Sequence, residues 1–176
     1  VRTLVFFKGC PLRCKWCANP EGLERKYQIM LRPTSCVGCG ACVPACPQGL
    51  HSISDTGEHL IDRTKDCIGC GACVEACNYS ALKVAGEYAT ISELLDYVEE
   101  DRAFYEQSGG GVTLGGGEVT AQPKAAESLL MACKQNGIHT AIETCGYTKK
   151  ETILRIAEYV DLFLFDIKNI NSDRHY

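Results

Sequence analysis

The most constraining feature of the sequence is a cysteine-rich segment that occurs twice. "SCVGCGACVPACP" (35–47) and "DCIGCGACVEACN" (66–78) match almost residue for residue, 31 positions apart, and each has the spacing C-x2-C-x2-C-x3-C. The chain holds 13 cysteines among 176 residues, and an odd number in closely spaced clusters favours metal binding over disulfide bridges. We therefore expect a segment that folds around bound metal, in a reducing and cytoplasmic setting.

The spacing of each run is typical of two-cluster bacterial ferredoxins, in which the last cysteine of one run binds the other run's cluster. We expect two [4Fe–4S] clusters, the first held by Cys36, Cys39, Cys42 and Cys77 and the second by Cys67, Cys70, Cys73 and Cys46. The glycines between these cysteines should let backbone N–H groups turn toward the cluster sulfurs. A pair of structural zinc sites is the alternative, and this spacing disfavours it. The segment is predicted to be an electron-transfer module.

The rest of the chain alternates between strands and helices. Apolar runs predict strands at 3–7, 111–116, 138–144 and 161–168, and helices are expected at 89–109, 123–137 and 148–160. Two of the helices should begin with capping boxes, Thr90 with Glu93 and Thr148 with Glu151. Strands joined by single helices give a parallel sheet.

These elements predict an α/β fold, a partial (β/α) barrel interrupted by a ferredoxin-like domain. The expected divisions are 1–29, 30–84 and 85–176. The chain begins and stops abruptly in apolar runs, so we expect a fragment that lacks a segment before Val1 and the last barrel strands.

Polar residues follow all four predicted strands, where parallel sheets gather their active groups. These residues are the loop from Cys10 to Cys17, the turn from Gly115 to Glu118, the pair Glu143 and Thr144, and finally Asp166 with Lys168. Four strand ends that converge on one site favour an enzyme over a binding module.

Cys10, Cys14 and Cys17 have the spacing C-x3-C-x2-C, which supplies three ligands where an electron-transfer cluster or a zinc site takes four. Two further cysteines could supply a fourth. Cys133 lies in the middle of a predicted helix and is expected to be a small buried hydrophobe. Cys145 follows a strand and is the alternative fourth ligand. We expect that no protein ligand fills this position.

The three-cysteine loop, with Trp16 before its last cysteine, resembles that of radical S-adenosylmethionine (SAM) enzymes. "GCPLRCKWCANPE", the two-cluster segment and "GGGVTLGGGEVTAQP" together are similar to glycyl radical enzyme activating enzymes, over essentially the whole chain. "AIETCGYTK" and "DLFLFDIKNINSDRHY" resemble the group within this family that serves choline trimethylamine-lyase. Activases of glycerol or diol dehydratases share the layout and are the alternative.

The resemblance implies a reaction and its cofactors. The open iron of the cluster at Cys10, Cys14 and Cys17 binds SAM, and an electron cleaves SAM to a 5′-deoxyadenosyl radical. That radical abstracts hydrogen from a glycine of the partner enzyme. Three [4Fe–4S] clusters are implied, one that binds SAM and two auxiliary, and the auxiliary pair is expected to relay electrons from a ferredoxin or flavodoxin.

The resemblance also implies site residues. Gly116, Gly117 and Glu118 match a G-G-E motif that holds the methionine amino group of SAM, and Trp16 would lie against the adenine. Glu143 and Thr144 match an Asp-Thr pair near SAM and a monovalent cation, with Glu where the family has Asp. Asp166 and Lys168 match a D-x-K motif that faces SAM. An internal salt bridge is their alternative role.

The composition argues against a nucleic-acid partner and against a membrane-spanning segment. The formal net charge is −4 with mixed signs, so no basic stripe indicates a nucleic acid. No apolar run approaches ~18 residues, so no membrane span is expected. A ferredoxin-like carrier and a radical SAM enzyme that acts on a small molecule are the competing hypotheses. The expected location is the cytoplasm, with association with a bacterial microcompartment as the alternative to a free protein.

Overall fold

The computed structural model describes residues 1–171, and the chain divides into two compact units. The sheet unit consists of Val1–Glu24 and the chain from Tyr88 onward, and the cysteine-rich unit is Arg25–Glu87. Both cysteine repeats lie in the second unit. The expected boundaries at residues 30 and 84 fall just inside it. No helix among the described residues is both long enough and apolar enough to cross a membrane.

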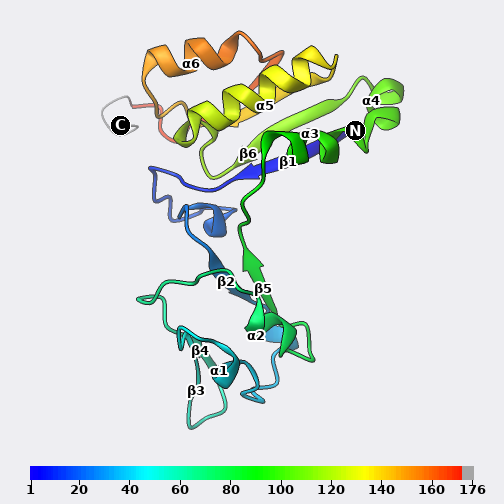
Figure 1. Ribbon diagram of the computed structural model, residues 1–176. Helices are drawn as coiled ribbons and strands as arrows, with labels where there is room; N and C mark the ends of the chain where they lie inside the picture. The colour runs from blue at the N-terminus through cyan, green and yellow to red at the C-terminus, as the bar shows by residue number, and fades with distance from the viewer. Residues whose placement is uncertain (172–176) are drawn as a thin grey trace. The chain divides into compact units, whose positions relative to one another are not determined.

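The sheet unit is built on four parallel strands, as expected. They are β1 (Arg2–Phe7), β6 (Gly111–Gly116), β7 (His139–Thr144) and β8 (Leu162–Phe165), and their spatial order is β1-β6-β7-β8. Figure 1 shows the first pair of this sheet, β1 beside β6. Helices α3 (Ile91–Glu99), α4 (Arg102–Ser108), α5 (Pro123–Gln135) and α6 (Lys150–Ala157) connect or precede these strands. The short 3-10 helices η1 (Pro20–Gly22) and η3 (Val119–Ala121) follow β1 and β6.

The two faces of this sheet differ because successive strand residues point to opposite sides. Val112, Leu114 and Ile142 point into a core that includes residues of α3, α5 and α6, and all three are fully buried. Leu4 and Phe6 alternate with the buried residues of β1, and about half of each side chain is exposed. Helices therefore cover one face, and the other, the open face, carries exposed apolar side chains.

The helix expected at 89–109 is wrong in one respect, since the structure divides it into α3 and α4. The break lies at Asp101, whose backbone leaves the helical region (φ −94°, ψ 8°). The Asp101 carboxylate accepts a hydrogen bond from the Thr3 hydroxyl on β1. That contact joins the start of α4 to β1, the edge strand of the sheet. Tyr105 of α4 donates a hydrogen bond to the Val98 carbonyl at the end of α3.

One of the two predicted capping boxes is present. Thr90 accepts from the Glu93 amide, and the Glu93 carboxylate accepts from the Thr90 amide, so both halves of the first box form. The second prediction is wrong, because α6 has Lys149 as its N-cap and no side-chain cap. The Thr148 amide instead donates to the Gly146 carbonyl in a turn before the helix.

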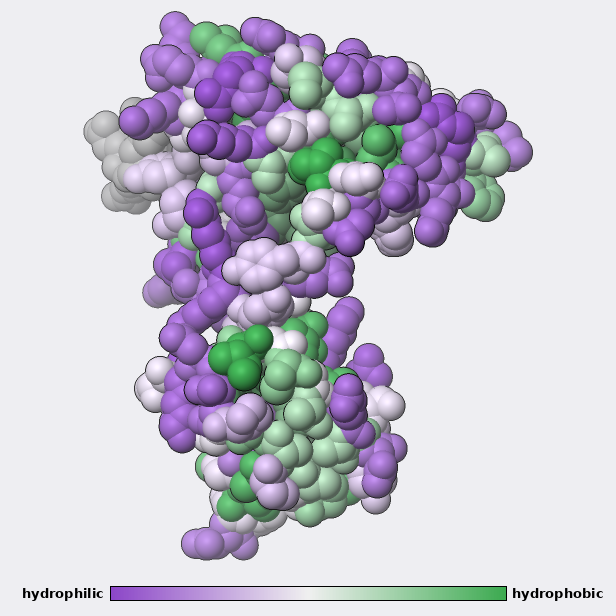
Figure 2. All heavy atoms as spheres, viewed as in Figure 1, coloured by the Kyte–Doolittle hydropathy of each residue, from purple (hydrophilic) through white to green (hydrophobic). Residues whose placement is uncertain are grey.

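The cysteine-rich unit contains two antiparallel strand pairs and two one-turn helices. Strand β2 (Gln28–Leu31) pairs with β5 (Leu82–Ala85), and β3 (His51–Ile53) pairs with β4 (His59–Ile61). Each cysteine run contains a short helix, α1 (Cys42–Ala45) or α2 (Ala72–Glu75), and the 3-10 helix η2 (Pro33–Ser35) precedes the first run. Figure 2 shows hydrophobic residues over much of the visible face of this unit, and its large exposed side chains include Met30, Val37, Leu60 and Ile68.

Candidate functional site

The three-cysteine loop is fixed to the glycine turn that follows β6. The Gly117 amide donates to the Phe7 carbonyl at 2.8 Å, and the Glu118 amide donates to the Gly9 carbonyl at 2.8 Å. The Gly9 amide in turn donates to the Gly22 carbonyl at 2.7 Å, which closes the loop. A Cβ at Gly117 would lie 2.5 Å from the carbonyl oxygen of Gly9 and 2.5 Å from that of Gly22. Only glycine at this position lets the loop and the turn approach so closely.

The three thiols of the loop lie close enough to influence one another. Burial raises the pKa of Cys10, and the charges of Glu118, Cys14 and Cys17 raise it further. A cation held among these sulfurs would offset that repulsion and stabilise the thiolates. The donor set of the loop therefore fits a bound metal cluster. Trp16 lies in the same loop with 72% of its surface exposed, so its ring is accessible to a ligand.

Glu118 is the most heavily bonded residue of the site. Only 2% of it is exposed, and its carboxylate accepts five hydrogen bonds. One oxygen accepts from the Thr120 amide (3.0 Å), the Thr120 hydroxyl (2.8 Å) and the Thr144 hydroxyl (2.6 Å). The other accepts from the Cys145 amide (2.9 Å) and thiol (3.0 Å). Glu118 thus joins the ends of β6 and β7.

The same contacts determine the pKa values of Glu118 and Cys145. Burial alone would raise the pKa of Glu118, but the donors from Cys145, Thr144 and Thr120 outweigh it and hold that pKa below its usual value. Burial and the Glu118 carboxylate raise the pKa of Cys145 to about 12. Cys145 is therefore a protonated donor to Glu118 in this structure. That role disfavours it as a fourth thiolate ligand.

The last two residues of β7, Glu143 and Thr144, point to opposite faces of the sheet. Glu143 is exposed on the open face, where a Cβ at Gly115 would lie 2.8 Å from its carboxylate, whereas the adjacent Thr144 is buried against Glu118. Glu143 and Thr144 therefore do not converge on one point.

Beyond β8, Asp166 and Lys168 form an ion pair, and the Asp166 amide donates to the Thr144 carbonyl at 2.9 Å. Burial lowers the pKa of Lys168, but Asp166 and the nearby sulfurs of Cys14 and Cys145 raise it more.

Within the cysteine-rich unit, eight cysteines line two separate pockets. Four of them, Cys36, Cys39, Cys42 and Cys77, line the first pocket, and the other four, Cys46, Cys67, Cys70 and Cys73, line the second. Each pocket thus takes three cysteines from one run and the last cysteine of the other, which is the division expected from the sequence. Four thiols around one hollow form a donor set that fits a [4Fe–4S] cluster.

Backbone amides point at several of these sulfurs. The Gly69 amide donates to Cys67 at 3.4 Å, the Leu50 amide to Cys46 at 3.5 Å and the Ala81 amide to Cys77 at 3.4 Å. Gly69 has φ +73°, and a Cβ there would lie 2.7 Å from the ring of Tyr27. Glycine is thus required for the turn that directs this amide toward the sulfur.

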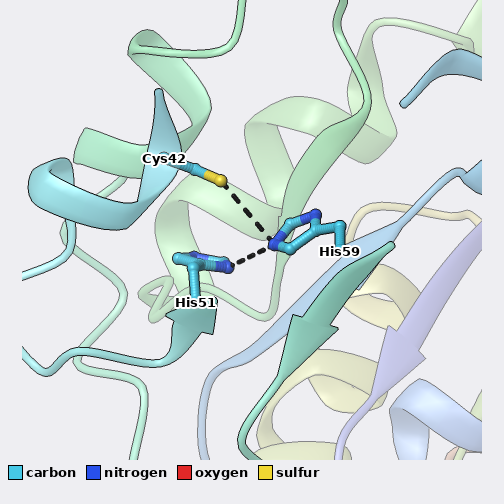
Figure 3. A group of neighbouring side chains, drawn as sticks. All are labelled: Cys42, His51 and His59. Atoms are coloured by element: carbon cyan, nitrogen blue, oxygen red, sulfur yellow. Dashed lines mark hydrogen bonds between the residues drawn. The ribbon is translucent and has the colours of Figure 1, made fainter. Parts of the chain in front are cut away.

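The sequence reasoning missed two buried histidines beside the first pocket. One ring nitrogen of His59 lies 3.7 Å from the Cys36 sulfur and the other lies 3.6 Å from the Cys42 sulfur. Figure 3 shows His59 with Cys42 and with His51, which contacts it from the neighbouring strand. Burial lowers the pKa of both rings, and in His51 the charges of His59 and Arg63 lower it further. The available signal was a histidine in each of two short apolar strands between the repeats.

Of the cysteines outside these clusters, Cys133 lies where it was expected. It is fully buried on α5 in the core of the sheet unit, beside Leu129 and Leu130. Burial raises the pKa of Cys133 to about 11, so its thiol stays protonated. The prediction of a small buried hydrophobe is confirmed.

Two family descriptions match the chain. That of the radical SAM superfamily matches residues 67–176, and that of a 4Fe-4S dicluster domain matches residues 35–82. The first covers more than half of the chain. The second covers both cysteine runs, which agrees with the two pockets that the structure places there.

The chain is also similar to several characterised activating enzymes. It is 65% identical to the choline trimethylamine-lyase activating enzyme of Oleidesulfovibrio alaskensis in an alignment of 177 positions, which covers 100% of this chain and 57% of the relative. It is 48% identical to the trans-4-hydroxy-L-proline dehydratase activating enzyme of Clostridioides difficile and to the (2S)-3-sulfopropanediol sulfolyase activating enzyme of Bilophila wadsworthia, in each case over 99% of this chain and 58% of the relative. The chain thus spans less than two thirds of these proteins.

Proposed function

The chain belongs to the radical SAM superfamily, and on that premise we propose that the whole protein activates a glycyl radical enzyme, choline trimethylamine-lyase. The observation that carries the proposal is the attachment of the three-cysteine loop to the glycine turn before Glu118. This contact brings three thiols and a SAM-type turn to one end of the sheet. An electron carrier needs neither feature. The 65% identity to an activating enzyme of this lyase supports the choice of partner.

In this proposal Cys10, Cys14 and Cys17 would hold a [4Fe–4S] cluster. Such a cluster, once reduced by an electron donor, would supply the electron that cleaves SAM to methionine and a 5′-deoxyadenosyl radical, and that radical would take a hydrogen atom from a glycine of the partner. Cys145 does not complete the ligand set, because its thiol donates to Glu118. The fourth coordination position is thereby left to SAM.

The other strand-end residues would bind and orient SAM. Gly116 and Gly117 supply a backbone turn for its methionine amino group, and the bonded Glu118 carboxylate fixes that turn. Lys168 and Asp166 present opposite charges near Cys14, which suits the carboxylate and ammonium groups of an amino acid. The accessible ring of Trp16 would stack on the adenine. The exposed Glu143 is the proposed ligand of a monovalent cation, whereas Thr144 would contribute through its hydrogen bond to Glu118.

We further propose that the sheet unit is part of a (β/α) barrel and that the cysteine-rich unit is an inserted ferredoxin-like domain. Helices cover one face of the sheet, and the apolar open face fits the interior of such a barrel. The two four-cysteine pockets fit two auxiliary [4Fe–4S] clusters, three clusters in all, that relay electrons from a ferredoxin or flavodoxin. None of the 13 cysteines is joined in a disulfide, which suits a reducing cytoplasm.

The test uses the full-length protein, reconstituted anaerobically and reduced, with SAM and purified choline trimethylamine-lyase. We expect 5′-deoxyadenosine together with a glycyl radical doublet in the electron paramagnetic resonance (EPR) spectrum. A lyase with its radical glycine replaced by Ala should show no doublet. Glycerol and diol dehydratases, offered in parallel, should give weaker doublets or none.

Two outcomes would contradict the proposal. Formation of 5′-deoxyadenosine without a doublet on any of these lyases would indicate a small-molecule radical SAM enzyme. Absence of both products, in protein that carries its clusters, would indicate an electron carrier. Cys14→Ala should abolish both products, whereas the matched variant Cys133→Ala, in the core of the sheet unit, should retain them.

A further inference from the structure

The two cysteine runs are nearly identical, yet the structure surrounds them with different side chains. His51 pairs with Ile61, and Leu82 pairs with Leu31. Leu82 follows His51 by 31 positions, which is the distance between the two cysteine runs, so the strand pairs β3–β4 and β2–β5 are equivalent elements of the repeat.

The same comparison can be made two residues further along each strand pair. His59 on β4 pairs with Ile53, and Ile29 on β2 pairs with Val84, so His59 and Ile29 occupy equivalent positions. His59 lines the first pocket and Ile29 lines the second. The two pockets therefore differ at this position. An imidazole lies beside the first set of four cysteines, and an alkyl group lies beside the second.

His59 touches cysteine sulfur with both of its ring nitrogens. Nδ1 lies 3.7 Å from the Cys36 sulfur, and Nε2 lies 3.6 Å from the Cys42 sulfur. Nε2 is also 3.0 Å from Nδ1 of His51, which approaches from the adjacent strand (Figure 3). The second pocket offers apolar groups instead, from residues such as Ile29, Leu50 and Ile68.

The hydrogen-bond inventory decides which nitrogen of His59 carries the proton. Each neutral ring has one N–H, and the 3.0 Å contact between the rings uses one N–H and one lone pair. If His59 donated to His51 through its Nε2–H, His51 would accept at Nδ1 and would carry its own proton on Nε2. That nitrogen is buried and has no hydrogen-bond partner among the described residues. If His51 donates to His59, the His59 Nδ1–H points at Cys36 and no buried N–H is left unpaired.

We propose that His59, oriented by His51, donates a hydrogen bond to the Cys36 sulfur and makes the cluster of the first pocket the more easily reduced of the two auxiliary clusters. This inference rests on the proposed function, because it requires that both pockets hold [4Fe–4S] clusters. Reduction adds one negative charge, part of which resides on the ligand sulfurs. A hydrogen-bond donor stabilises that charge, so the reduction potential rises. The alkyl group of Ile29 provides no such stabilisation in the second pocket.

The experiment is an EPR-monitored redox titration of the full-length reconstituted protein at one fixed pH. Replacing Cys10, Cys14 and Cys17 by Ala in all samples removes the SAM cluster and leaves the two auxiliary signals. We expect two distinct midpoint potentials before any histidine is changed. His59→Ile places an alkyl side chain in the first pocket, as Ile29 does in the second. It should lower the midpoint potential of the higher-potential cluster by about 59 mV, which corresponds to about a tenfold shift of the one-electron equilibrium toward the oxidised form. The other cluster should not move.

Further variants separate a hydrogen bond from a packing effect. His59→Asn places an amide N–H near the former Nδ1 and should recover most of the shift. His51→Leu leaves His59 in place but removes the partner that fixes its proton, so a smaller shift in the same direction is expected. Ile29→Leu, in the second pocket, is the matched control and should leave the higher potential unchanged.

Three results would overturn the inference. His59→Ile with full iron content and unchanged potentials would show that the imidazole does not influence the cluster. Loss of iron from both His59 variants, but not from Ile29→Leu, would make His59 a ligand or a structural residue. Parent protein that lacks the auxiliary clusters would overturn the cluster assignment on which the inference rests, and it would be recognised from its iron content before any histidine is changed.

Discussion

Replacement of Glu118 by Gln tests whether the junction between β6 and β7 depends on a buried carboxylate. The change keeps the shape of the side chain but converts one oxygen into an NH2 group. In the structure five donors surround the two oxygens, two of them backbone amides that cannot rotate away, from Thr120 and Cys145. These two amides bond to different oxygens. Whichever way the Gln amide is oriented, its NH2 group therefore faces one backbone N–H.

The cost of this change follows from the contacts. A buried N–H without an acceptor costs about 1–3 kcal/mol, and hydrogen bonds to a neutral oxygen are weaker than those to a carboxylate. We expect Glu118→Gln to destabilise the junction locally by about 3 kcal/mol, which corresponds to about a 100-fold change in an opening equilibrium. Glu118→Ala would leave all five donors unpaired and should be more damaging.

Amide hydrogen exchange read by mass spectrometry measures this effect where it occurs. Peptides that contain Thr120 or Cys145 should exchange about 100-fold faster in Glu118→Gln, whereas peptides from the cysteine-rich unit should not change. Glu106→Gln, an exposed carboxylate on α4, is the matched control. Unchanged exchange at both peptides would refute the view that the carboxylate stabilises the junction.

The same residue gives a prediction for pH. The pKa of Glu118 is held below its usual 4.5, so its contribution to stability is fully present above about pH 4.5. That contribution is lost as the pH falls through the lower pKa of the folded state. The exchange difference between the native protein and Glu118→Gln should therefore be constant near neutral pH and shrink below about pH 4.5. A difference that grew on acidification would contradict the direction of the shift.

Three further predictions concern other parts of the chain. The reconstituted protein should hold about twelve irons, and replacing Cys10, Cys14 and Cys17 together by Ala should remove about four of them and all SAM cleavage. The double variant Cys36→Ala/Cys67→Ala should lose more of the partner activation that a ferredoxin or flavodoxin drives than of the SAM cleavage that a small strong reductant drives. Equal loss with both reductants would indicate a structural role for the auxiliary clusters. Leu129→Ala, fully buried on α5, should lower the free energy of unfolding of the sheet unit by about 2–5 kcal/mol in denaturant titration, while Leu154→Ala on the exposed side of α6 should cost far less.

The sequence predicted those features that depend on local periodicity or on a repeat. Buried strands separated by helices gave the parallel sheet, and the four strand ends were placed at one edge because parallel strands share their direction. The exchange of Cys46 and Cys77 between the two pockets was also expected, since the repeat matches the two-cluster ferredoxin spacing. Thr90 and Glu93 lie three residues apart, so their capping box needed no tertiary information.

The errors and omissions arise from contacts between residues far apart in the sequence. Thr3 bonds to Asp101 across 98 positions, and that bond accompanies the break between α3 and α4. The donors to Glu118 include two residues from the end of β7, 26 and 27 positions away. His51 meets His59 only because the hairpin register places β3 and β4 side by side. Propensity and spacing carry no information about such pairings.

Glu118 also shows how a motif and a structure can assign different roles to one residue. The G-G-E motif suggests direct contact with SAM, but protein donors already bond to both carboxylate oxygens. The carboxylate should then act on SAM through the backbone turn that it fixes, whereas the Asp166 carboxylate, 61% exposed in its side chain and paired with Lys168, is accessible to the ligand. We expect Glu118→Gln to weaken SAM binding and accelerate amide exchange at Thr120 together, and Asp166→Asn to weaken SAM binding with no change in that exchange. Weakened binding in Glu118→Gln without faster exchange would show that the carboxylate contacts SAM itself.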